Sequence, residues 1–402
     1  MNQLPSTETA SVIRQPKPKP TPTPYLVQEL FVSRNATYGP PVVALAPPQA
    51  KPTMVNPSFF SVPGVIVADN EMTANTSGDL FVTSVCPSSG NNFGCIGEFA
   101  PPYTKAPIAV IRKGFESQIS CGSRHCLALD AQQNLYVANR PYIGYVVNEY
   151  ASPYSSAPIS VLHPKKKLSI LDDFGVVADG STVFMLLQVC KVKPSCNGWD
   201  AVANGYSSPL KWGSQTSQLT AGGTDGCQTG YSQSSCAPYD AAVDTSGDMF
   251  VSFGPSGRGN DGLVAEWTPP YKGKPNAVIT NEIFQPTSIA LDGKGDLFVL
   301  NNQSPEQLNI TEYSPPYKGS PIVISRGFGG DDDLGMIVVD SAGNLFLSDY
   351  GSNGQSGEIL EYKPPYAGTP IEITAGLSNF APLFLTLGPS KTKSHVKSVL
   401  RP

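Results

Sequence analysis

Apolar and polar residues alternate in short runs along this chain, and turn residues separate the runs. This period of two is typical of β-strands with one buried face, whereas an amphipathic helix has a period of 3.6 residues. Clear examples are AVDTSGDMFVSF (242–253), ALDGKGDLFVLN (290–301) and VVDSAGNLFLSD (338–349). In each example two apolar runs flank a turn that contains Asp and Gly. The pattern predicts an all-β protein.

These segments are copies of one repeat. The residue after the turn glycine is Asp248, Asp296 or Asn344, which gives a period of 48 residues in this part of the chain. Earlier copies are SGDLFVTS (77–84), ALDAQQNLYVAN (128–139) and the more divergent VVADGSTVFMLL (176–187). A second signature of the type Glu-Tyr-x-Pro-Pro-Tyr follows the copies at 97–111, 148–162, 265–279, 311–325 and 360–374, and a degenerate version lies at 204–220. Six repeats are therefore visible.

Each repeat predicts four strands. The first is short and ends at the Asp, and the others run through Leu-Phe-Val, Glu-Tyr and Pro-Ile-x-Val-Ile. Four antiparallel strands in about 45 to 50 residues, repeated around an axis, are typical of a β-propeller blade. We therefore expect a β-propeller.

The two ends of the propeller region look complementary. Residues 25–45 resemble the outer half of a repeat, with Glu29 at the Glu-Tyr position and residues 42–45 as the last strand, while residues 380–387 resemble an innermost strand. Soluble proteins avoid open sheet edges, so we predict seven blades, one of them shared by the termini. Six blades with decorated ends are the alternative.

This organisation divides the chain into three parts. Residues 1–24 form a Pro-rich spacer, which includes QPKPKPTPTP, and are expected to be disordered. The propeller is predicted over residues 25–388, and residues 389–402 form a C-terminal tail.

The Asp-x-x-Gly-Asn-Leu-Phe-Val unit resembles that of NHL-repeat propellers, whose relatives include the streptogramin lyase and gluconolactonase types. The resemblance covers about residues 60 to 375. It implies the propeller fold, but propellers of this kind have many unrelated functions. The lyases and lactonases rely on metal-binding carboxylates or on histidines that line the pore, and we find no matching residues here.

The eight cysteines fall into four close pairs, each five to nine residues apart. The pairs are Cys86 and Cys95, Cys121 and Cys126, Cys190 and Cys196, and Cys227 and Cys236. Zinc sites usually have two-residue spacings within each pair, so four local disulfides are the better interpretation. Disulfides indicate an extracytoplasmic protein that is secreted, periplasmic or on the cell surface. Residues 1–10 lack the basic and apolar regions of a signal peptide.

Charge and hydropathy exclude two classes of partner. The formal net charge is −5, whereas nucleic-acid binding needs clustered basic residues. The run Lys165–Lys167 is read as a solvated loop. The sequence contains no stretch of 18 or more apolar residues, so it predicts no transmembrane helix. We expect a monomer without a cofactor.

The repeated motifs are predicted to be structural. The Asp and Gly fit tight hairpins, and a catalytic residue is seldom repeated in every blade. We expect the Pro-Pro-Tyr segments to fix the outer hairpin while the Tyr ring packs on a neighbouring blade. The repeated residues in question are Glu98, Glu149, Glu266, Glu312, Glu361, Tyr103, Tyr271, Tyr317 and Tyr366.

The two faces of the predicted ring differ. The Asp-Gly turns and the Pro-Pro-Tyr turns lie on one face, which we call the repeat-turn face. The cysteine pairs lie on the opposite face, which we call the stapled face. Variable loops on a rigid scaffold often carry binding residues. The alternative interpretation is that the disulfides only stabilise long loops. Candidate exposed binding residues near the second-strand ends are Arg140, Tyr142, Trp199, Arg258, Asp349 and Tyr350.

These features favour a scaffold that binds an unidentified protein or carbohydrate ligand through its stapled face. The alternative is an NHL-like lyase or lactonase with a metal site at the pore mouth. The sequence shows no His-x-x-x-His motif, nucleophile elbow or Ser-His-Asp order. Asp331, Asp332 and Asp333 are only a weak calcium candidate, because consecutive aspartates cannot all face one ion. Three carboxylates or histidines that converge at the pore mouth would favour the enzyme.

Overall fold

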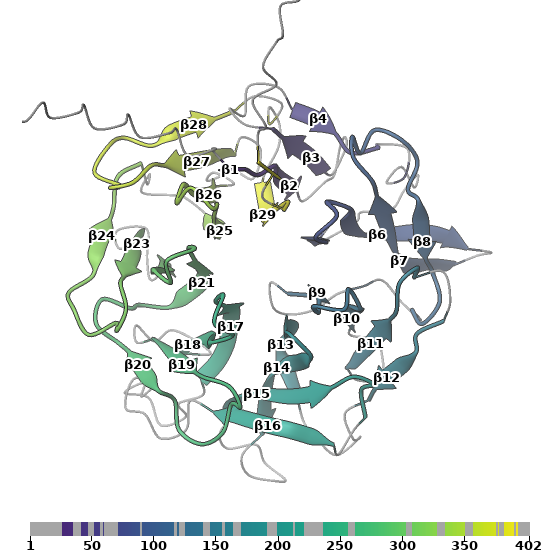
Figure 1. The fold of residues 1–402 in the computed structure, drawn as a ribbon, viewed down its shortest axis with the longest axis horizontal. Coiled ribbons are helices and arrows are strands. Elements are labelled where there is room, and N and C mark those ends of the chain that lie inside the picture. The colour runs from purple at the N-terminus through teal and green to yellow at the C-terminus, as the bar shows by residue number, and fades with distance from the viewer. Residues whose placement is uncertain are drawn as a thin grey trace, which may run out of the picture.

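The structure is a computed structural model, and it shows a ring of seven four-stranded antiparallel sheets (Figure 1). The protein is therefore a seven-bladed β-propeller, as the sequence predicted. The described residues are 26–34, 42–46, 52–56, 59, 71–88, 91–115, 119, 125–139, 145–154, 157–163, 170–190, 199–211, 214–220, 236–255, 262–302, 308–327, 334–349, 357–374, 377, 382–389 and 391–392.

Six blades are each built from one continuous repeat, with the first strand at the channel and the fourth at the rim (Figure 1). Blade 1 contains β5 (Met72–Ala74), β6 (Leu80–Ser88), β7 (Asn91–Phe99) and β8 (Ala109–Ile111). Blade 2 contains β9 (Leu127–Leu129), β10 (Leu135–Asn139), β11 (Val146–Tyr150) and β12 (Ser160–Leu162). Blade 3 contains β13 (Ile170–Asp179), β14 (Thr182–Cys190), β15 (Trp199–Ser207) and β16 (Gln215–Thr220).

The remaining three single-repeat blades follow in chain order. Blade 4 contains β17 (Cys236–Val243), β18 (Met249–Pro255), β19 (Leu263–Trp267) and β20 (Ala277–Ile279). Blade 5 contains β21 (Pro286–Leu291), β22 (Leu297–Asn302), β23 (Leu308–Tyr313) and β24 (Ile322–Ile324). Blade 6 contains β25 (Leu334–Val339), β26 (Leu345–Asp349), β27 (Glu358–Tyr362) and β28 (Ile371–Ile373).

The seventh blade, which we call the closing blade, is shared by the two ends of the chain. Its order is β29–β2–β3–β4, with β29 (Pro382–Leu387) innermost, followed by β2 (Leu30–Arg34), β3 (Val42–Leu45) and β4 (Pro52–Met54). Leu30 pairs with Leu387 across the seam. The prediction of a shared blade is confirmed.

One detail of that prediction is wrong. The N-terminal segment supplies three strands rather than two, so β3 is the third strand and not the last. Glu29 precedes the second strand and does not occupy the Glu-Tyr position. The final strand, β4, has the sequence PTM and lacks the Pro-Ile-x-Val-Ile signature, which is why the alternation alone did not reveal it.

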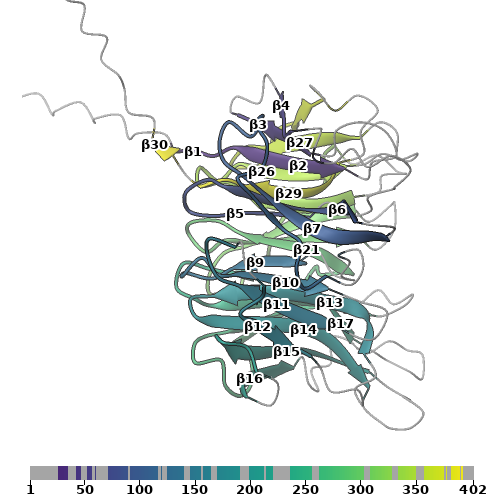
Figure 2. The same ribbon diagram turned by 90° about the vertical axis from the view of Figure 1, so that its right-hand side faces the viewer.

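A short two-stranded sheet joins the chain ends outside the ring. It pairs β1 (Leu26–Val27) with β30 (Lys391–Thr392), which lies in the predicted C-terminal tail. The side chain of neighbouring Pro389 lies over Gly78 in the Asp-Gly turn of blade 1. Both chain ends therefore leave the propeller on its repeat-turn face, on the left in Figure 2.

The Pro-Pro-Tyr segments hold adjacent blades together, as predicted. Each Tyr has a positive φ, between 55° and 66°, and its hydroxyl donates a hydrogen bond to a backbone carbonyl of the first turn in its own blade. For Tyr317 and Tyr366 these acceptors are Gly295 O and Gly343 O, at 2.9 and 2.7 Å. The rings make edge contacts with the preceding blade in the pairs Phe31–Tyr103, Phe81–Tyr154, Phe184–Tyr271, Phe250–Tyr317 and Phe298–Tyr366.

Two blades extend beyond the others at the stapled face. Strands β6 and β7 have nine residues each, and so do β14 and β15, whereas β10 and β11 have five. Four extra residues add roughly 13 Å to a strand. The longer strands begin level with the others near the Asp-Gly turns, so the additional length lies at the opposite end. In Figure 2 the β6–β7 hairpin projects to the right, away from β1 and β30.

Candidate functional site

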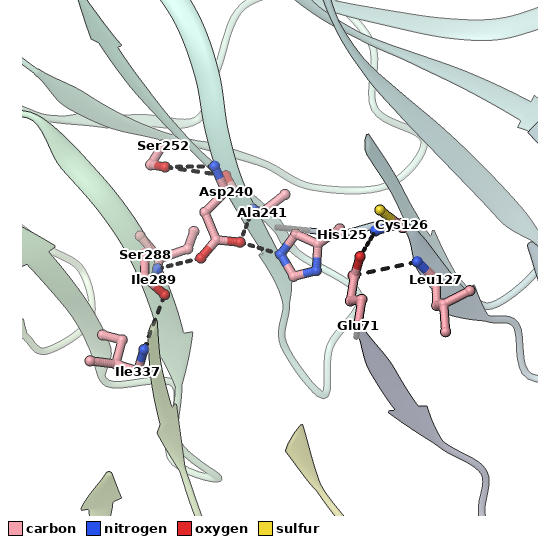
Figure 3. A network of polar contacts seen from close by, with 10 residues as sticks. All are labelled: Glu71, His125, Cys126, Leu127, Asp240, Ala241, Ser252, Ser288, Ile289 and Ile337. Carbon is pink, nitrogen blue, oxygen red and sulfur yellow. Dashed lines mark hydrogen bonds and ion pairs between the residues drawn. The ribbon is translucent and has the colours of Figure 1, made fainter. Parts of the chain in front are cut away.

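A network of polar contacts surrounds the channel where the innermost strands begin (Figure 3). Its members come from a position four residues before the turn Asn or Asp, namely Glu71, Asp240 and Ser288. Their side chains accept hydrogen bonds from backbone N–H groups of the next blade. Asp240 Oδ2 accepts from Ile289 N at 2.8 Å, and Ser288 Oγ accepts from Ile337 N at 3.2 Å.

Glu71 makes the same kind of contact between blades 1 and 2. Its carboxylate accepts hydrogen bonds from Cys126 N and from Leu127 N, the latter at 3.4 Å. The backbone N–H of Glu71 donates to Thr83 Oγ1 in its own blade at 2.9 Å. Glu71 is 4 % exposed, and its hydrogen bonds from these peptide groups join blades 1 and 2.

His125 connects blades that are not adjacent. It precedes β9 of blade 2, and its Nε2 contacts Asp240 Oδ1 on β17 of blade 4. Its carbonyl accepts a hydrogen bond from Val176 N of blade 3 at 2.7 Å. The position in blade 3 that matches Asp240 is Gly175, which has no side chain, so the imidazole reaches past this blade to its partner.

The Asp240 carboxylate is completely buried, and both of its oxygens are engaged. Besides His125 and Ile289 N, it accepts a hydrogen bond from Ala241 N at 2.8 Å. The backbone of Asp240 exchanges hydrogen bonds with Ser252 Oγ at 3.0 and 3.3 Å. Burial of a charge is tolerated where hydrogen bonds and a partner compensate it. This network therefore connects blades 4 and 5. It leaves the side chain of His125 21 % exposed near the axis of the ring.

These residues do not form a metal centre. Among the described residues, no group of three or more His, Cys, Asp or Glu side chains is arranged to hold a metal ion. The predicted calcium candidates Asp331, Asp332 and Asp333 lie outside the described residues. The convergence of ligands that would favour an enzyme is thus not found in the described part of the channel mouth.

The predicted binding residues are only partly visible. Arg140, Tyr142, Arg258 and Tyr350 lie outside the described residues, and Trp199 begins β15 with its side chain outside the description. Their role in binding stays a prediction.

Asp349, the last residue of β26, is 5 % exposed rather than exposed as predicted. The reason is its position in the middle of a sheet, because it pairs with Leu334 on β25 and with Glu358 on β27. Its role as a binding residue remains untested.

One predicted disulfide is present in full. Cys86 and Cys95 are bonded, with their Cα atoms 5.8 Å apart. Both residues lie within strands β6 and β7 rather than in a loop, so the bond clamps a projecting hairpin. Cys126 is also disulfide-bonded. Its partner and the side chains of the remaining four cysteines lie outside the described part of the structure. None of the cysteines that the structure does describe is free.

No motif of the sequence predicted the channel network, and His125, Glu71, Asp240 and Ser288 are not among the candidate site residues proposed from the sequence. A signal was nevertheless available, because Glu71, Asp240 and Ser288 all occupy the fourth position before the turn Asx of their repeats. This position lies near the start of the innermost strand, where a polar side chain can accept hydrogen bonds from backbone N–H groups of the next blade.

Comparisons with known proteins identify the fold alone. No family model and no curated protein matches the chain. A solved protein from Lactobacillus plantarum is 11 % identical, with a TM-score of 0.52 over 90 % of this chain and 99 % of its own. A quinonprotein alcohol dehydrogenase-like protein from Bacteroides thetaiotaomicron is 9 % identical, with a TM-score of 0.53 over 89 % of this chain and 77 % of its own. Neither likeness carries an activity to this protein at such identities.

No helix within the described ranges has the length and apolar character needed to cross a membrane. This agrees with the absence of a long apolar stretch in the sequence.

Proposed function

We propose that the protein is a secreted or surface-tethered β-propeller, of the NHL-repeat type, that binds a protein or carbohydrate ligand through its stapled face. The observation that carries this proposal is the β6–β7 hairpin, which projects from that face and is cross-linked by Cys86–Cys95. A cross-linked hairpin loses less conformational entropy when it binds a ligand than a free loop does. It is therefore suited to present a fixed recognition surface.

The opposite face supports the same assignment. The Tyr hydroxyls of the Pro-Pro-Tyr segments and the first carboxylate of each Asp-Gly turn make contacts within the ring, such as Tyr317 with Gly295 and Asp244 with Asp248 N. Groups that are already engaged inside the fold are poorly placed to recognise a ligand. On this proposal the repeat-turn face has a structural role and the stapled face recognises the ligand.

The exit of the chain ends fits a tethered protein. Strands β1 and β30 lie on the repeat-turn face, and the long hairpins point away from them (Figure 2). A Pro-rich spacer attached at this side holds the stapled face outward. The disulfides Cys86–Cys95 and that of Cys126 support an oxidising, extracytoplasmic location.

The channel network favours a scaffold over a lactonase or lyase. The buried carboxylates of Glu71 and Asp240 accept hydrogen bonds from backbone N–H groups, so their lone pairs serve inter-blade contacts. A lactonase of the kind considered needs carboxylates that are open toward a metal ion and substrate.

Binding by the full-length chain to arrays of immobilised oligosaccharides and extracellular-matrix proteins tests the proposal. We expect Trp199→Ala and Arg258→Ala, the two variants at predicted binding residues, to weaken binding by at least about tenfold, which corresponds to ~1.4 kcal/mol. The matched controls Lys274→Ala and Lys318→Ala change exposed residues of the repeat-turn face, and we expect them to bind as the wild type does.

Two results would contradict the proposal. One is loss of binding in the control variants but not in the stapled-face variants. The other is hydrolysis of glucono-δ-lactone by the oxidised protein in the presence of Ca²⁺ or Mn²⁺, which would establish the enzyme alternative.

A further inference from the structure

The Asp-Gly turns of three blades pair one carboxylate with one carboxamide across the turn. In blade 1, Asn75 Nδ2 donates to Asp79 Oδ2 at 2.9 Å. In blade 6, Asn344 Nδ2 donates to Asp340 Oδ2 at 2.8 Å, and the Asp130–Asn134 pair of blade 2 has the same distance. Two carboxylate oxygens facing each other would repel, whereas the amide N–H donates a hydrogen bond to the carboxylate. The side chains at the first and fifth turn positions therefore attract each other in these blades.

Blades 4 and 5 have carboxylates at both positions. The pairs are Asp244 with Asp248 and Asp292 with Asp296. The first Asp keeps its usual role, since Asp244 Oδ1 accepts hydrogen bonds from Ser246 N and Asp248 N, both at 2.8 Å. The fifth residue has no amide to donate. Asp248 Oδ1 is buried and has no hydrogen-bond partner in the described structure.

A third carboxyl group lies beside each of these pairs. Glu266 faces Phe250 on the adjacent strand, and Asp248 lies two residues before Phe250, so both carboxyl groups point to the same side of blade 4. Glu312 is related to Asp296 in the same way through Phe298. We call Asp244, Asp248 and Glu266 the blade 4 acid niche, and Asp292, Asp296 and Glu312 the blade 5 acid niche.

Burial and like charge disfavour full ionisation of both niches. Burial, together with Asp296 and Asp292, raises the pKa of Glu312 to about 7, although Lys294 partly opposes this. Burial, with Asp248 and Asp244, also raises the pKa of Glu266. Glu312 Oε2 is another buried oxygen without a partner among the described groups.

The described Tyr hydroxyls that neighbouring blades bring to the niches are already engaged in other hydrogen bonds. Tyr317 of blade 5 faces the blade 4 niche and Tyr366 of blade 6 faces the blade 5 niche, but their hydroxyls donate to Gly295 O and Gly343 O. Beside the blade 4 turn, the Tyr271 hydroxyl contacts Asp179 of blade 3 and Gly247 O.

Blade 2 shows the contrasting arrangement. There the Tyr136 hydroxyl lies 2.9 Å from Asp130 Oδ2 and 3.2 Å from Glu149 Oε1. Leu210 N also donates to Glu149, at 3.1 Å. The corresponding side chains in blades 4 and 5 are Phe250 and Phe298, which have no hydroxyl.

We propose that the acid niches of blades 4 and 5 are pH-sensitive fasteners that take up protons below neutral pH and thereby strengthen the contacts of blades 4, 5 and 6. The glutamates are the groups that take up these protons, because their pKa values are the ones that are raised. A protonated Glu266 or Glu312 no longer repels the Asp pair beside it, whereas in blade 6 the amide of Asn344 already compensates the turn carboxylate.

The direction of the pH dependence follows from proton binding. A carboxyl group whose pKa is higher in the folded than in the unfolded protein binds more protons in the folded state, so folding is favoured as pH falls. The destabilisation is absent below about pH 4.5, the ordinary value for Glu, and is complete above about pH 7 for Glu312.

Thermal unfolding of the full chain between pH 4.5 and pH 8, in the presence of EDTA, tests the proposal. The variant Asp248→Asn/Asp296→Asn restores the carboxylate–amide pairs found in the other blades. At pH 7.5 we expect its melting temperature to exceed that of the wild type by on the order of 2 to 4 °C. This difference should shrink near pH 4.5, because Glu312, whose pKa is about 7, is then protonated and no longer repels Asp292 and Asp296.

The matched control is Asn344→Asp, which installs an Asp pair in blade 6. It should lower the melting temperature more at pH 7.5 than near pH 4.5, because the raised pKa of the adjoining Glu361 favours its protonation at the lower pH. A double Asn variant that shows no gain at any pH, or the same gain at every pH, would overturn the proposal. If millimolar Ca²⁺ instead stabilises the wild type at pH 7.5 and the double Asn variant loses this effect, the niches bind a cation and the proton mechanism is wrong.

Discussion

At the scale of single residues, the Tyr of each Pro-Pro-Tyr segment joins its blade to the preceding one. The Tyr of the Pro-Pro-Tyr segments looks like a ligand for a Pro-recognising domain, yet its occurrence in almost every repeat indicated a structural role. The structure confirms this, because the rings of Tyr317 and Tyr366 lie 5.4 Å from Phe250 and Phe298 of the preceding blades. Blade 3 has Leu210 at this position, and it packs in the same kind of core.

The Tyr366 side chain allows the hydroxyl and the ring to be tested separately. Tyr366→Phe leaves the carbonyl of Gly343 without its donor and should cost about 1 kcal/mol of unfolding free energy. Tyr366→Leu also removes the edge contact with Phe298, so its total cost should be about 2 to 3 kcal/mol. Urea denaturation measures both values. Equal stability of the Phe variant and the wild type would show that the hydroxyl contributes nothing.

The candidate site was much harder to predict at this scale. Asp240 and Glu71 bind backbone N–H groups of another blade, and no local pattern reports which peptide group will face a side chain after ring closure. The contact of His125 with Asp240 spans 115 positions. Nearby sequence therefore gives no indication of it. The loop residues nominated for binding carry no repeat to constrain them.

At the scale of elements, strand order and blade boundaries could be predicted because each repeat encodes its own hairpins. The alternation of apolar residues and the Asp-Gly turn place β21, β22 and β23 from sequence alone. Strand length was not predictable in the same way. The nine-residue strands β6 and β7 continue through Cys86 and Cys95, although the cysteine pairs were expected in variable loops.

Peptide mapping of the oxidised protein tests the disulfides at this scale. Non-reducing digestion followed by mass spectrometry should recover Cys86–Cys95 and, in addition, Cys121–Cys126, Cys190–Cys196 and Cys227–Cys236. The short spacing within each pair is the reason for this expectation. A peptide that joins Cys95 to Cys121, or free thiols at several positions, would remove the argument for an extracytoplasmic location.

At the scale of the whole molecule, the chain ends revealed how the ring closes. Each end contained the part of a blade that the other lacked, and the general avoidance of open edges made their pairing the simplest solution. The number of strands from each end was not as clear, since β4 has no repeat signature. The propeller was therefore predictable as an architecture, while its ligand was not.

Two truncations test closure. Deletion of residues 1–24 should leave the melting temperature almost unchanged, because no strand of the closing blade is lost. Deletion of residues 1–46 removes β2 and β3 and leaves β29 without its partner, so we expect a sharply lower melting temperature. Similar melting of the longer truncation and the full chain would contradict the shared blade and favour six self-contained blades.

The seam between β2 and β29 also orders events during biosynthesis. Strands β2, β3 and β4 precede blades 1 to 6 in the chain, but β29, which covers the inner edge of β2, is made only after these six blades. Pairing over such a long sequence separation is slow, and an uncovered edge invites association with other chains. The nascent propeller thus carries an uncovered edge while blades 1 to 6 are being made. A chaperone that shields this edge until β29 arrives would act at the most vulnerable point of the folding process.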